Sequence, residues 1–258
     1  MNAQTANPSA ASVQEAASSP GLSSGVKLAL WIVGLVALSV MPFLVKNYVV
    51  FQFTLVFVYA IAVLGLNILT GYNGQISLGH GAFYAIGAYS TAILMDAANF
   101  PYWATLPFAA VICFIVGYLM GFPALRLGGH YLALATFALA LATPQLLKYK
   151  KIEGVTGGVQ GIVLMKPSPP FTFELFGQKF NDDRWLYFFC LAIMLLMFWL
   201  AVNLLRGRIG RALIAIRDHP IAASAMGINL PVFKSAVFGT SAAFTGVAGA
   251  LGAIAVAF

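Results

Sequence analysis

The polar residues best suited to contact a solute lie in the stretch LNILTGYNGQISLGHGAFYAIGAYSTAIL at residues 66–94. Within it lie the polar residues Asn67, Gln75, Ser77 and His80. In an apolar chain, such groups either line the wall of a transport pathway or satisfy one another between packed helices. The sequence leaves both interpretations open, and His80 taken singly is more typical of a hydrogen-bonded packing residue.

A helix break is predicted inside this stretch by Gly71, Asn73 and Gly74, which are turn-forming residues. A broken helix at membrane depth is tolerated where it is buried in protein or lines a wet cavity. Small residues four apart follow the break and predict close helix packing in lipid. These pairs are Gly81 with Ala85 and Gly87 with Thr91.

Motifs for covalent or metal chemistry are absent from the sequence. It contains no G-x-x-x-x-G-K-[ST] phosphate loop and no H-E-x-x-H pair, and Cys113 and Cys190 lie in apolar runs as expected of small buried hydrophobes. No charged residue lies in the middle of a predicted membrane span, which argues against coupling to an ion gradient. We therefore expect a non-catalytic chain with no cofactor or metal.

The composition indicates a polytopic membrane protein, because 61% of the 258 residues are hydrophobic and 8% are charged. Soluble domains carry about 25% charged residues. An all-α helix bundle is predicted, since a lone strand in lipid leaves its backbone groups unpaired. Runs of about 20 apolar residues give about seven spans. They lie near 28–45, 49–70, 77–95, 104–122, 130–147, 186–205 and 235–258.

The two ends of the chain differ in character. Residues 1–26 are rich in Ala, Ser, Gln and Pro and are predicted to be a disordered tail, followed by a membrane domain at 27–258. The final run, GTSAAFTGVAGALGAIAVAF, stops in apolar sequence, so we expect either that the natural chain continues or that its end is trimmed, and we favour a missing portion. Small residues form two helical stripes there. The stripes are Ser235, Gly239 and Ala243, and Ala242, Gly246 and Ala250.

The formal net charge of +7 is concentrated in short segments between apolar runs, which indicates membrane topology rather than nucleic-acid binding. Basic residues outnumber the single acid Asp218 at residues 206–234, so this loop and the amino terminus are predicted to be cytoplasmic, and the loop at 148–185 extracytoplasmic. The basic residues are Arg206, Arg208, Arg211, Arg217 and Lys234.

The basic loop is predicted to hold two short helices. The first has an apolar stripe of Ile209, Leu213 and Ile216. The second begins at Pro220, with Asp218 or His219 as its cap, and stops at Gly227. Helices this short need support. They either lie on anionic lipid as an interfacial element or dock on a cytosolic partner.

Several motifs, in order, resemble the permeases of branched-chain amino-acid ABC transporters. They are LTGYNGQISLGHGAFYAIGAY, LRLGGHYLALATFALA, TGGVQGI and GRALIAIRDHPIAASAMGIN. The resemblance covers about residues 66–253. IAASAMGINLP matches the A-A-x-x-x-G core of the importer coupling loop, with Ile221 where the general pattern has Glu.

The resemblance implies a multi-pass subunit of a bacterial inner membrane that forms a pathway with a second permease subunit. Two cytosolic ATP-binding subunits would dock on the coupling loops, and an extracytoplasmic binding protein would deliver a small amino acid. The motif match assigns coupling to six residues, namely Arg211, Arg217, Asp218, Ala222, Ala223 and Gly227. It assigns the pathway wall to Gln75, Ser77, Gly79 and His80.

The motif TGGVQGI lies on the predicted outer loop, where Thr156, Gly157, Gly158 and Gly161 either shape the outer mouth, receive the binding protein or form a plain glycine-rich turn. Two other functions stay open from the sequence. One is an ion-coupled secondary transporter of small solutes. The other is a non-transporting membrane anchor whose basic loop recruits a partner.

Overall fold

The computed structural model describes residues 24–126, 130–151, 153–158, 160–169, 174–175 and 178–257. Most of the predicted amino-terminal tail, residues 1–23, lies outside the described residues. The chain divides into two units, Met1–Leu44 and Val45–Phe258. The first unit contains one helix, α2 (Ser24–Leu44), in the place of the first predicted span.

The second unit is built from long helices joined by short connections. Its long helices are α3 (Asn47–Asn67), α4 (His80–Ala98), α5 (Tyr102–Arg126), α6 (His130–Leu147), α8 (Asp182–Arg206) and α11 (Leu230–Val256). Its short elements are the π-helix η1 (Ile68–Tyr72), α7 (Glu153–Thr156), β1 (Glu174–Leu175), β2 (Gln178–Lys179), α9 (Arg208–Asp218) and α10 (Pro220–Ala225). With α2, each of the seven predicted spans is therefore matched by a helix, which confirms the all-α bundle.

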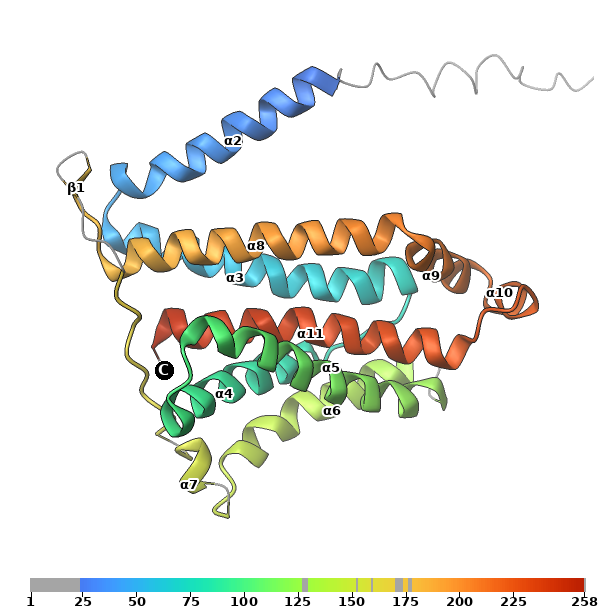
Figure 1. Cartoon of the computed structure of the whole chain (residues 1–258). Helices are drawn as coiled ribbons and strands as arrows, with labels where there is room; N and C mark the ends of the chain where they lie inside the picture. Colours follow the sequence, from blue (N-terminus) through green and yellow to red (C-terminus); the bar gives the residue numbers. More distant parts are fainter. Residues whose placement is uncertain are drawn as a thin grey trace, which may run out of the picture. The chain divides into compact units, whose positions relative to one another are not determined.

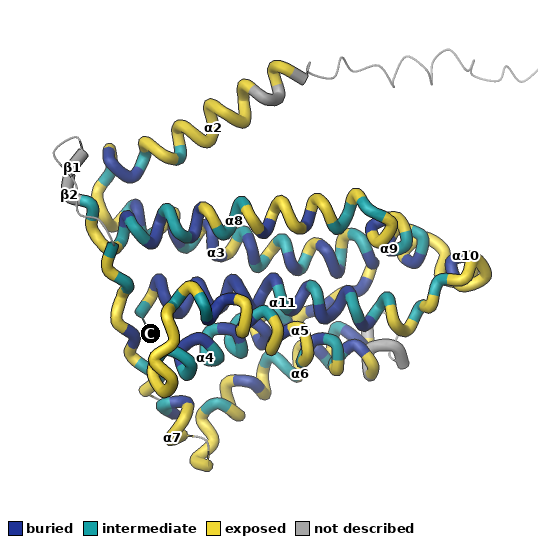
Figure 2. The backbone as a smooth tube through the Cα atoms, in the orientation of Figure 1, coloured by how far each residue is buried: buried dark blue, intermediate teal, exposed yellow. Residues whose placement is uncertain are grey.

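Helix α11 is the centre of the second unit. It packs against α5, α4 and α3, while α8 packs on α3 and α6 on α4. Figure 1 shows α11 between a layer of α3 with α8 and a layer of α4, α5 and α6. The apolar stretch of α11 is 89% buried, against 22% for that of α8. Figure 2 shows the same contrast along the two helices.

The central position of α11 depends on its small residues. Glycines at 87 and 246 let α11 approach α4 and α5 closely. A Cβ atom on Gly87 of α4 would overlap the carbonyl of Gly246, and a Cβ atom on Gly246 would overlap the side chain of Cys113 of α5. Gly117 and Gly121 of α5 meet the two predicted stripes of α11 in the same way. The predicted close-packing faces are confirmed, except at Gly81, where an added Cβ atom would meet nothing within 4 Å among the described atoms.

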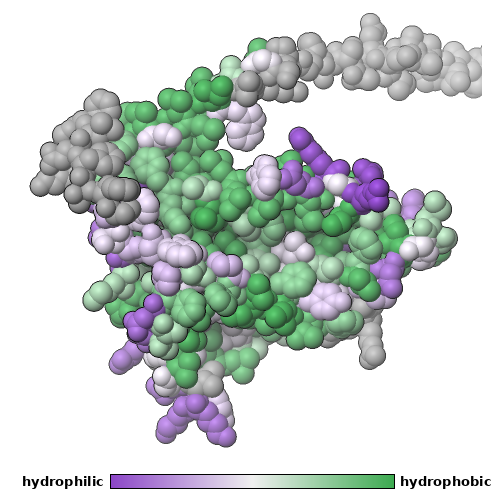
Figure 3. Space-filling model, viewed as in Figure 1, coloured by the Kyte–Doolittle hydropathy of each residue, from purple (hydrophilic) through white to green (hydrophobic). Residues whose placement is uncertain are grey.

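Four helices of the described chain are long and apolar enough to cross a membrane: Asn47–Tyr72, Tyr102–Phe122, Asp182–Arg206 and Leu230–Val256. Shorter apolar helices cover Ala29–Leu44 and Tyr131–Leu147. The predicted third span corresponds to α4, whose glycine, serine and tyrosine residues make it less apolar than these four. Figure 3 shows hydrophobic side chains over the long helices, and hydrophilic ones near α9 and α7.

The loop between α6 and α8 contains structure that the sequence analysis did not predict. Two strands of two residues each, β1 and β2, form an antiparallel pair with Glu174 opposite Lys179. Backbone groups in a loop outside the lipid bond to a neighbouring strand or to water, so a short hairpin there does not conflict with the helical rule for spans.

We predict that G87A destabilises the second unit, because the added methyl group would meet the backbone of α11, which has no free side to move into. Overpacking of this kind costs about 1–3 kcal/mol. Unfolding of the purified protein in a denaturing detergent titration measures the loss. The matched control is G81A on the same helix, where a Cβ meets nothing within 4 Å. Equal stability of G87A and the unsubstituted chain would contradict this packing.

Candidate functional site

The predicted helix break lies between α3 and α4. Helix α3 runs into the π-helix η1, which ends at Tyr72, and Gly74 has a φ of +70°, a conformation that favours glycine. Residues 74–79 form neither helix nor strand. The break is thus confirmed, and the following helix begins at His80 rather than at residue 77 because the chain is still irregular there. We call residues 71–79 the break segment.

Side chains of the break segment alternate between the inside and the outside of the bundle. Asn73, Gln75 and Ser77 are buried, whereas Ile76 and Leu78 are 46% and 58% exposed. A period of two is that of extended chain. The segment therefore turns its polar groups toward the helices and its apolar groups outward, which is the reverse of a water-facing surface.

His80 closes a hydrogen-bond network between three helices. Its Nδ1 lies 3.0 Å from Ser77 Oγ, and its Nε2 lies 2.6 Å from Ser241 Oγ on α11. Ser241 Oγ donates to the carbonyl of Gly65 on α3 at 2.6 Å, so it accepts a hydrogen from His80 Nε2. With Nδ1 accepting from the Ser77 hydroxyl, a neutral imidazole satisfies every member of the network.

The carboxyl end of the break segment is fixed on α6. The backbone N–H of Leu78 donates to Thr136 Oγ1 at 3.0 Å. Gly79 lies so close to Thr136 that a Cβ atom would come within 2.5 Å of its carbonyl oxygen. Two buried side chains of the segment have polar atoms without a hydrogen-bond partner within the described residues: both polar atoms of Asn73, and Oε1 of Gln75.

The four residues predicted for the pathway wall thus divide into two groups. Ser77, Gly79 and His80 have the contacts of packing residues, as one of the two interpretations of the sequence required. Gln75, joined by its neighbour Asn73, keeps unpaired polar groups. The sequence analysis missed Ser241 and Thr136, because a lone hydroxyl in an apolar helix does not show which helix it will face.

The basic loop folds into the two predicted short helices, α9 and α10. Leu213 and Ile216 of α9 are buried as predicted, but the third buried position is Gly210, and Ile209 is 45% exposed. The difference arises because α9 turns back on the end of α8, where a side chain at 210 would overlap the carbonyl of Leu205.

Helix α10 begins and ends as its sequence predicts. Pro220 occupies its first turn, and Gly227 follows it with a φ of +85°. His219 is the N-cap residue, but no side chain caps the helix. The predicted cap by Asp218 is absent, since its carboxylate instead accepts a hydrogen bond from Arg217 Nε at 2.9 Å.

Arg217 also connects the basic loop to the helix break. Its Nη1 donates to the carbonyl of Gly71 at 2.8 Å, across 146 residues of sequence. Its Cγ lies against Gly74, where a Cβ atom would come within 2.8 Å of it. The side chain is 42% exposed, so part of the guanidinium group remains at the surface.

The outer surface of the loop is apolar and hollowed. Ile221 and Met226 are 86% and 84% exposed, whereas Ala223 is buried. A hollow of about 270 Å³ lies between α9 and α10. Its lining includes Ala215, Asp218, His219, Ala222, Ala223 and Met226.

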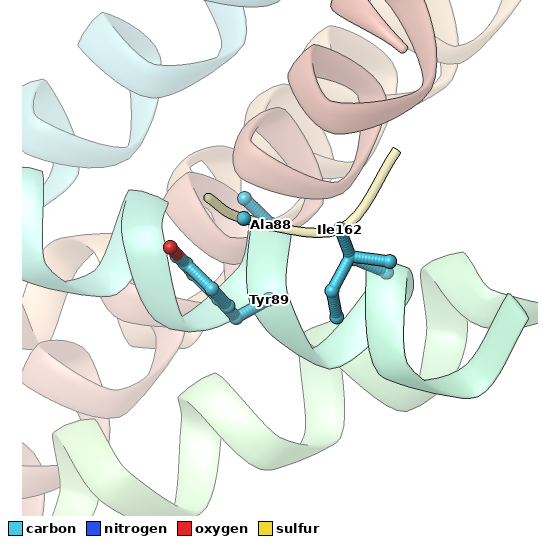
Figure 4. A pocket seen from close by; sticks show the side chains of 5 residues that line it. Ala88, Tyr89 and Ile162 are labelled. Carbon is cyan, nitrogen blue, oxygen red and sulfur yellow. The ribbon is translucent and has the colours of Figure 1, made fainter. Parts of the chain in front are cut away.

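The glycine-rich motif of the predicted outer loop forms a tight turn. Gly157, Gly158 and Gly161 all have positive φ, and Thr156 Oγ1 donates to the carbonyl of Leu147 at 2.7 Å. The turn places the following residues against α4. Figure 4 shows Ile162 across a small pocket from Ala88 and Tyr89. The pocket has a volume of about 110 Å³.

The described residues contain no cluster of three His, Cys, Asp or Glu side chains able to hold a metal ion. They bring together a helix break and a loop that contacts it.

A comparison with protein families agrees with this geometry. The family described as "Branched-chain amino acid transport system / permease component" matches residues 48–257, which contain both the break segment and the basic loop. The chain belongs to this permease family. No solved structure matches it.

Two curated relatives of this permease carry the description "High-affinity branched-chain amino acid transport system permease protein LivM". The protein from Escherichia coli (strain K12) is 36% identical over 247 residues, and that from Salmonella typhimurium (strain LT2) is 35% identical over 247 residues. Each match covers 88% of this chain and 58% of the relative. The permease chain therefore spans less than two thirds of the length of these relatives.

We predict that S241A destabilises the permease more than S90A does. Loss of the Ser241 hydroxyl leaves Nε2 of His80 without its partner inside the bundle, and it removes one of the hydrogen bonds that the carbonyl of Gly65 accepts. The expected cost is about 1–3 kcal/mol. Ser90 donates only to the carbonyl of Ile86 on its own helix, so its removal leaves no second side chain unpaired. Thermal unfolding of the two purified variants measures the difference. Equal unfolding temperatures would show that the network contributes nothing to packing.

Proposed function

We propose that this chain is the translocation subunit of an ATP-driven importer in the bacterial inner membrane. Its substrates are branched-chain amino acids or related small amino acids and amides. The descriptions of the two curated relatives support this substrate class. The second permease subunit, the cytosolic ATP-binding subunits and the extracytoplasmic binding protein are the partners that the proposal requires.

The observation that carries the proposal is the exposed end of the basic loop. Helix α10 has six residues, too few to be stable without support, and it presents Ile221 and Met226 outward. Large apolar side chains exposed on a marginal helix indicate a surface that a partner covers. We infer that an ATP-binding subunit covers it, with the small residues Ala222 and Gly227 admitting the helix into a groove.

The charged residues of the loop divide their roles in this proposal. Arg211 is exposed, and no hydrogen bond or ion pair holds it within the described residues, so it is available to the ATP-binding subunit. Arg217 and Asp218 form an ion pair at the end of α9, just before the corner to α10. Ala223 is the buried residue of α10, so it lies on the side of the helix that faces the rest of the chain. On this proposal, the amino terminus and residues 206–234 face the cytoplasm.

We assign the pathway to the side of the bundle that holds the break segment. Gln75 offers an unpaired oxygen on the inner side of the segment, and Ile76 and Leu78 offer an apolar outer side to a second permease subunit. The turn at Thr156, Gly157, Gly158 and Gly161 is proposed to shape the outer mouth, where the binding protein would release its solute.

Coupling to an ion gradient is less well supported than coupling to ATP. None of the acidic side chains that the structure describes is buried. A carboxylate inside the bundle is the usual mark of proton or cation coupling. ATP drives transport in the proposal because the loop binds the two states of the ATP-binding subunits with different affinity, and that difference shifts the helices between inward- and outward-open arrangements.

We predict that A222W lowers recovery of the ATP-binding subunits with this chain by about tenfold or more, because Ala222 lines the hollow and a bulky side chain there would occupy it. Affinity purification from membranes, followed by quantification of the ATP-binding subunits, measures the effect. The control is M165W, at a position that is 91% exposed on the proposed outer side. Unchanged recovery with A222W would place the docking surface elsewhere.

Uptake by vesicles that contain the complete transporter tests the function itself. We expect uptake of labelled leucine, isoleucine or valine to require ATP on the side of the membrane where the ATP-binding subunits lie. We also expect uptake to persist when ionophores collapse the ion gradients. Uptake that stops with the gradients and ignores ATP would identify a secondary transporter. Partner recruitment without any uptake would identify a membrane anchor.

A further inference from the structure

We propose that Arg217 is the positioning residue through which movement of the coupling loop reaches the break segment, and that it sets the exposure of residues 73–78. This inference rests on the proposed function, because it needs an ATP-binding subunit to move the loop. It assigns to Arg217 an internal role, in place of direct contact with that subunit.

The first support is the geometry of the contact. Arg217 donates from Nη1 to the carbonyl of Gly71 at 2.8 Å and from Nε to Asp218 at 2.9 Å. The same guanidinium group therefore bonds the last turn of η1 and the corner between α9 and α10. An arginine fork with two fixed acceptors has little freedom of orientation, so a shift of the corner either moves Gly71 or breaks a hydrogen bond.

The second support is that the loop contacts the break segment at one end only. The end at Leu78 and His80 is bonded to Thr136 of α6 and to Ser241 of α11. The end at Gly71 belongs to η1, which continues α3, and it is also bonded to Arg217 of the loop. When the loop moves against the membrane helices, the Arg217 contact therefore passes the displacement to Gly71 and the residues that follow it.

The third support is that the segment can follow the movement. Gly71 and Gly74 have no side chains, and Gly74 is already in a conformation that favours glycine. The polar atoms of Asn73, and Oε1 of Gln75, have no partner within the described residues. A displacement that brings them to water breaks no hydrogen bond of theirs and relieves the cost of burying them unpaired.

A thiol reporter in the segment tests the inference in the complete transporter. Ile76 is 46% exposed, so I76C gives an accessible thiol, while the native Cys113 and Cys190 are buried. We expect the rate of maleimide labelling at I76C to differ between the nucleotide-free and ATP-bound transporter by about fivefold or more, the lower end for coupled sites.

Variants of two arginines then separate docking of the ATP-binding subunits from the response of the break segment. In R217Q we expect the labelling rates with and without ATP to become equal, while the ATP-binding subunits still copurify and hydrolyse ATP. R217K should restore part of the response, because one ammonium group reaches a single acceptor. The control is R208Q on the same helix, which is exposed and makes no hydrogen bond or ion pair within the described residues.

A substitution at Gly74 tests the contact between Arg217 and the break segment from the segment's side. G74A places a methyl group against Arg217 Cγ and strains the backbone at positive φ, so it should also abolish the ATP response. The matched control, G81A, adds a methyl group in open space.

The outcomes distinguish this inference from the proposed function. If the unsubstituted transporter binds no ATP-binding subunit, or takes up solute without ATP, the proposed function fails. If the subunits bind and R217Q still shows the full ATP response at I76C, the inference about Arg217 fails alone. A response lost in R208Q as strongly as in R217Q would also overturn it, since loop charge in general would then be the cause.

Discussion

The structure depends on the contact of helix backbones with one another around α11. In a membrane, apolar side chains gain little by leaving lipid for protein, so helices associate through close van der Waals contact and hydrogen bonds. Glycine at 87, 117 and 246 brings the backbones of α4, α5 and α11 to a separation that no side chain would allow. Every functional feature is positioned by this contact, since Ser241 lies in the same helix and binds both His80 and Gly65.

Two contacts hold the break segment between the bundle and the basic loop. The His80 network fixes one end of the break segment to the bundle, and the Arg217 contact joins its other end to the basic loop. The segment between them is irregular backbone with polar groups inside and apolar groups outside. Irregular backbone is tolerated at membrane depth where protein buries it.

The sequence predicted most of the fold, because apolar runs and glycine signals are local properties. The seven spans, the break at Gly71 to Gly74, the two short helices and the stop at Gly227 were all readable from neighbouring residues. Contacts between distant residues were not. Nothing local in the sequence shows that Ser241 faces His80, or that Arg217 bonds a carbonyl 146 positions away. At the start of α9, Gly210 is buried in place of the predicted Ile209 for the same reason, since the nearby end of α8 decides which residue it covers.

Burial of α11 on all sides has a consequence for biogenesis. Helices enter the membrane in chain order, so α3, α4 and α5 are synthesised before α11, which fills their glycine-lined faces in the described part of the chain. The groove for α11 must therefore stay available while α6 and α8 are made. Insertion of this helix is then the late step that completes the core, joins His80 to Ser241 and fixes the break segment on the bundle.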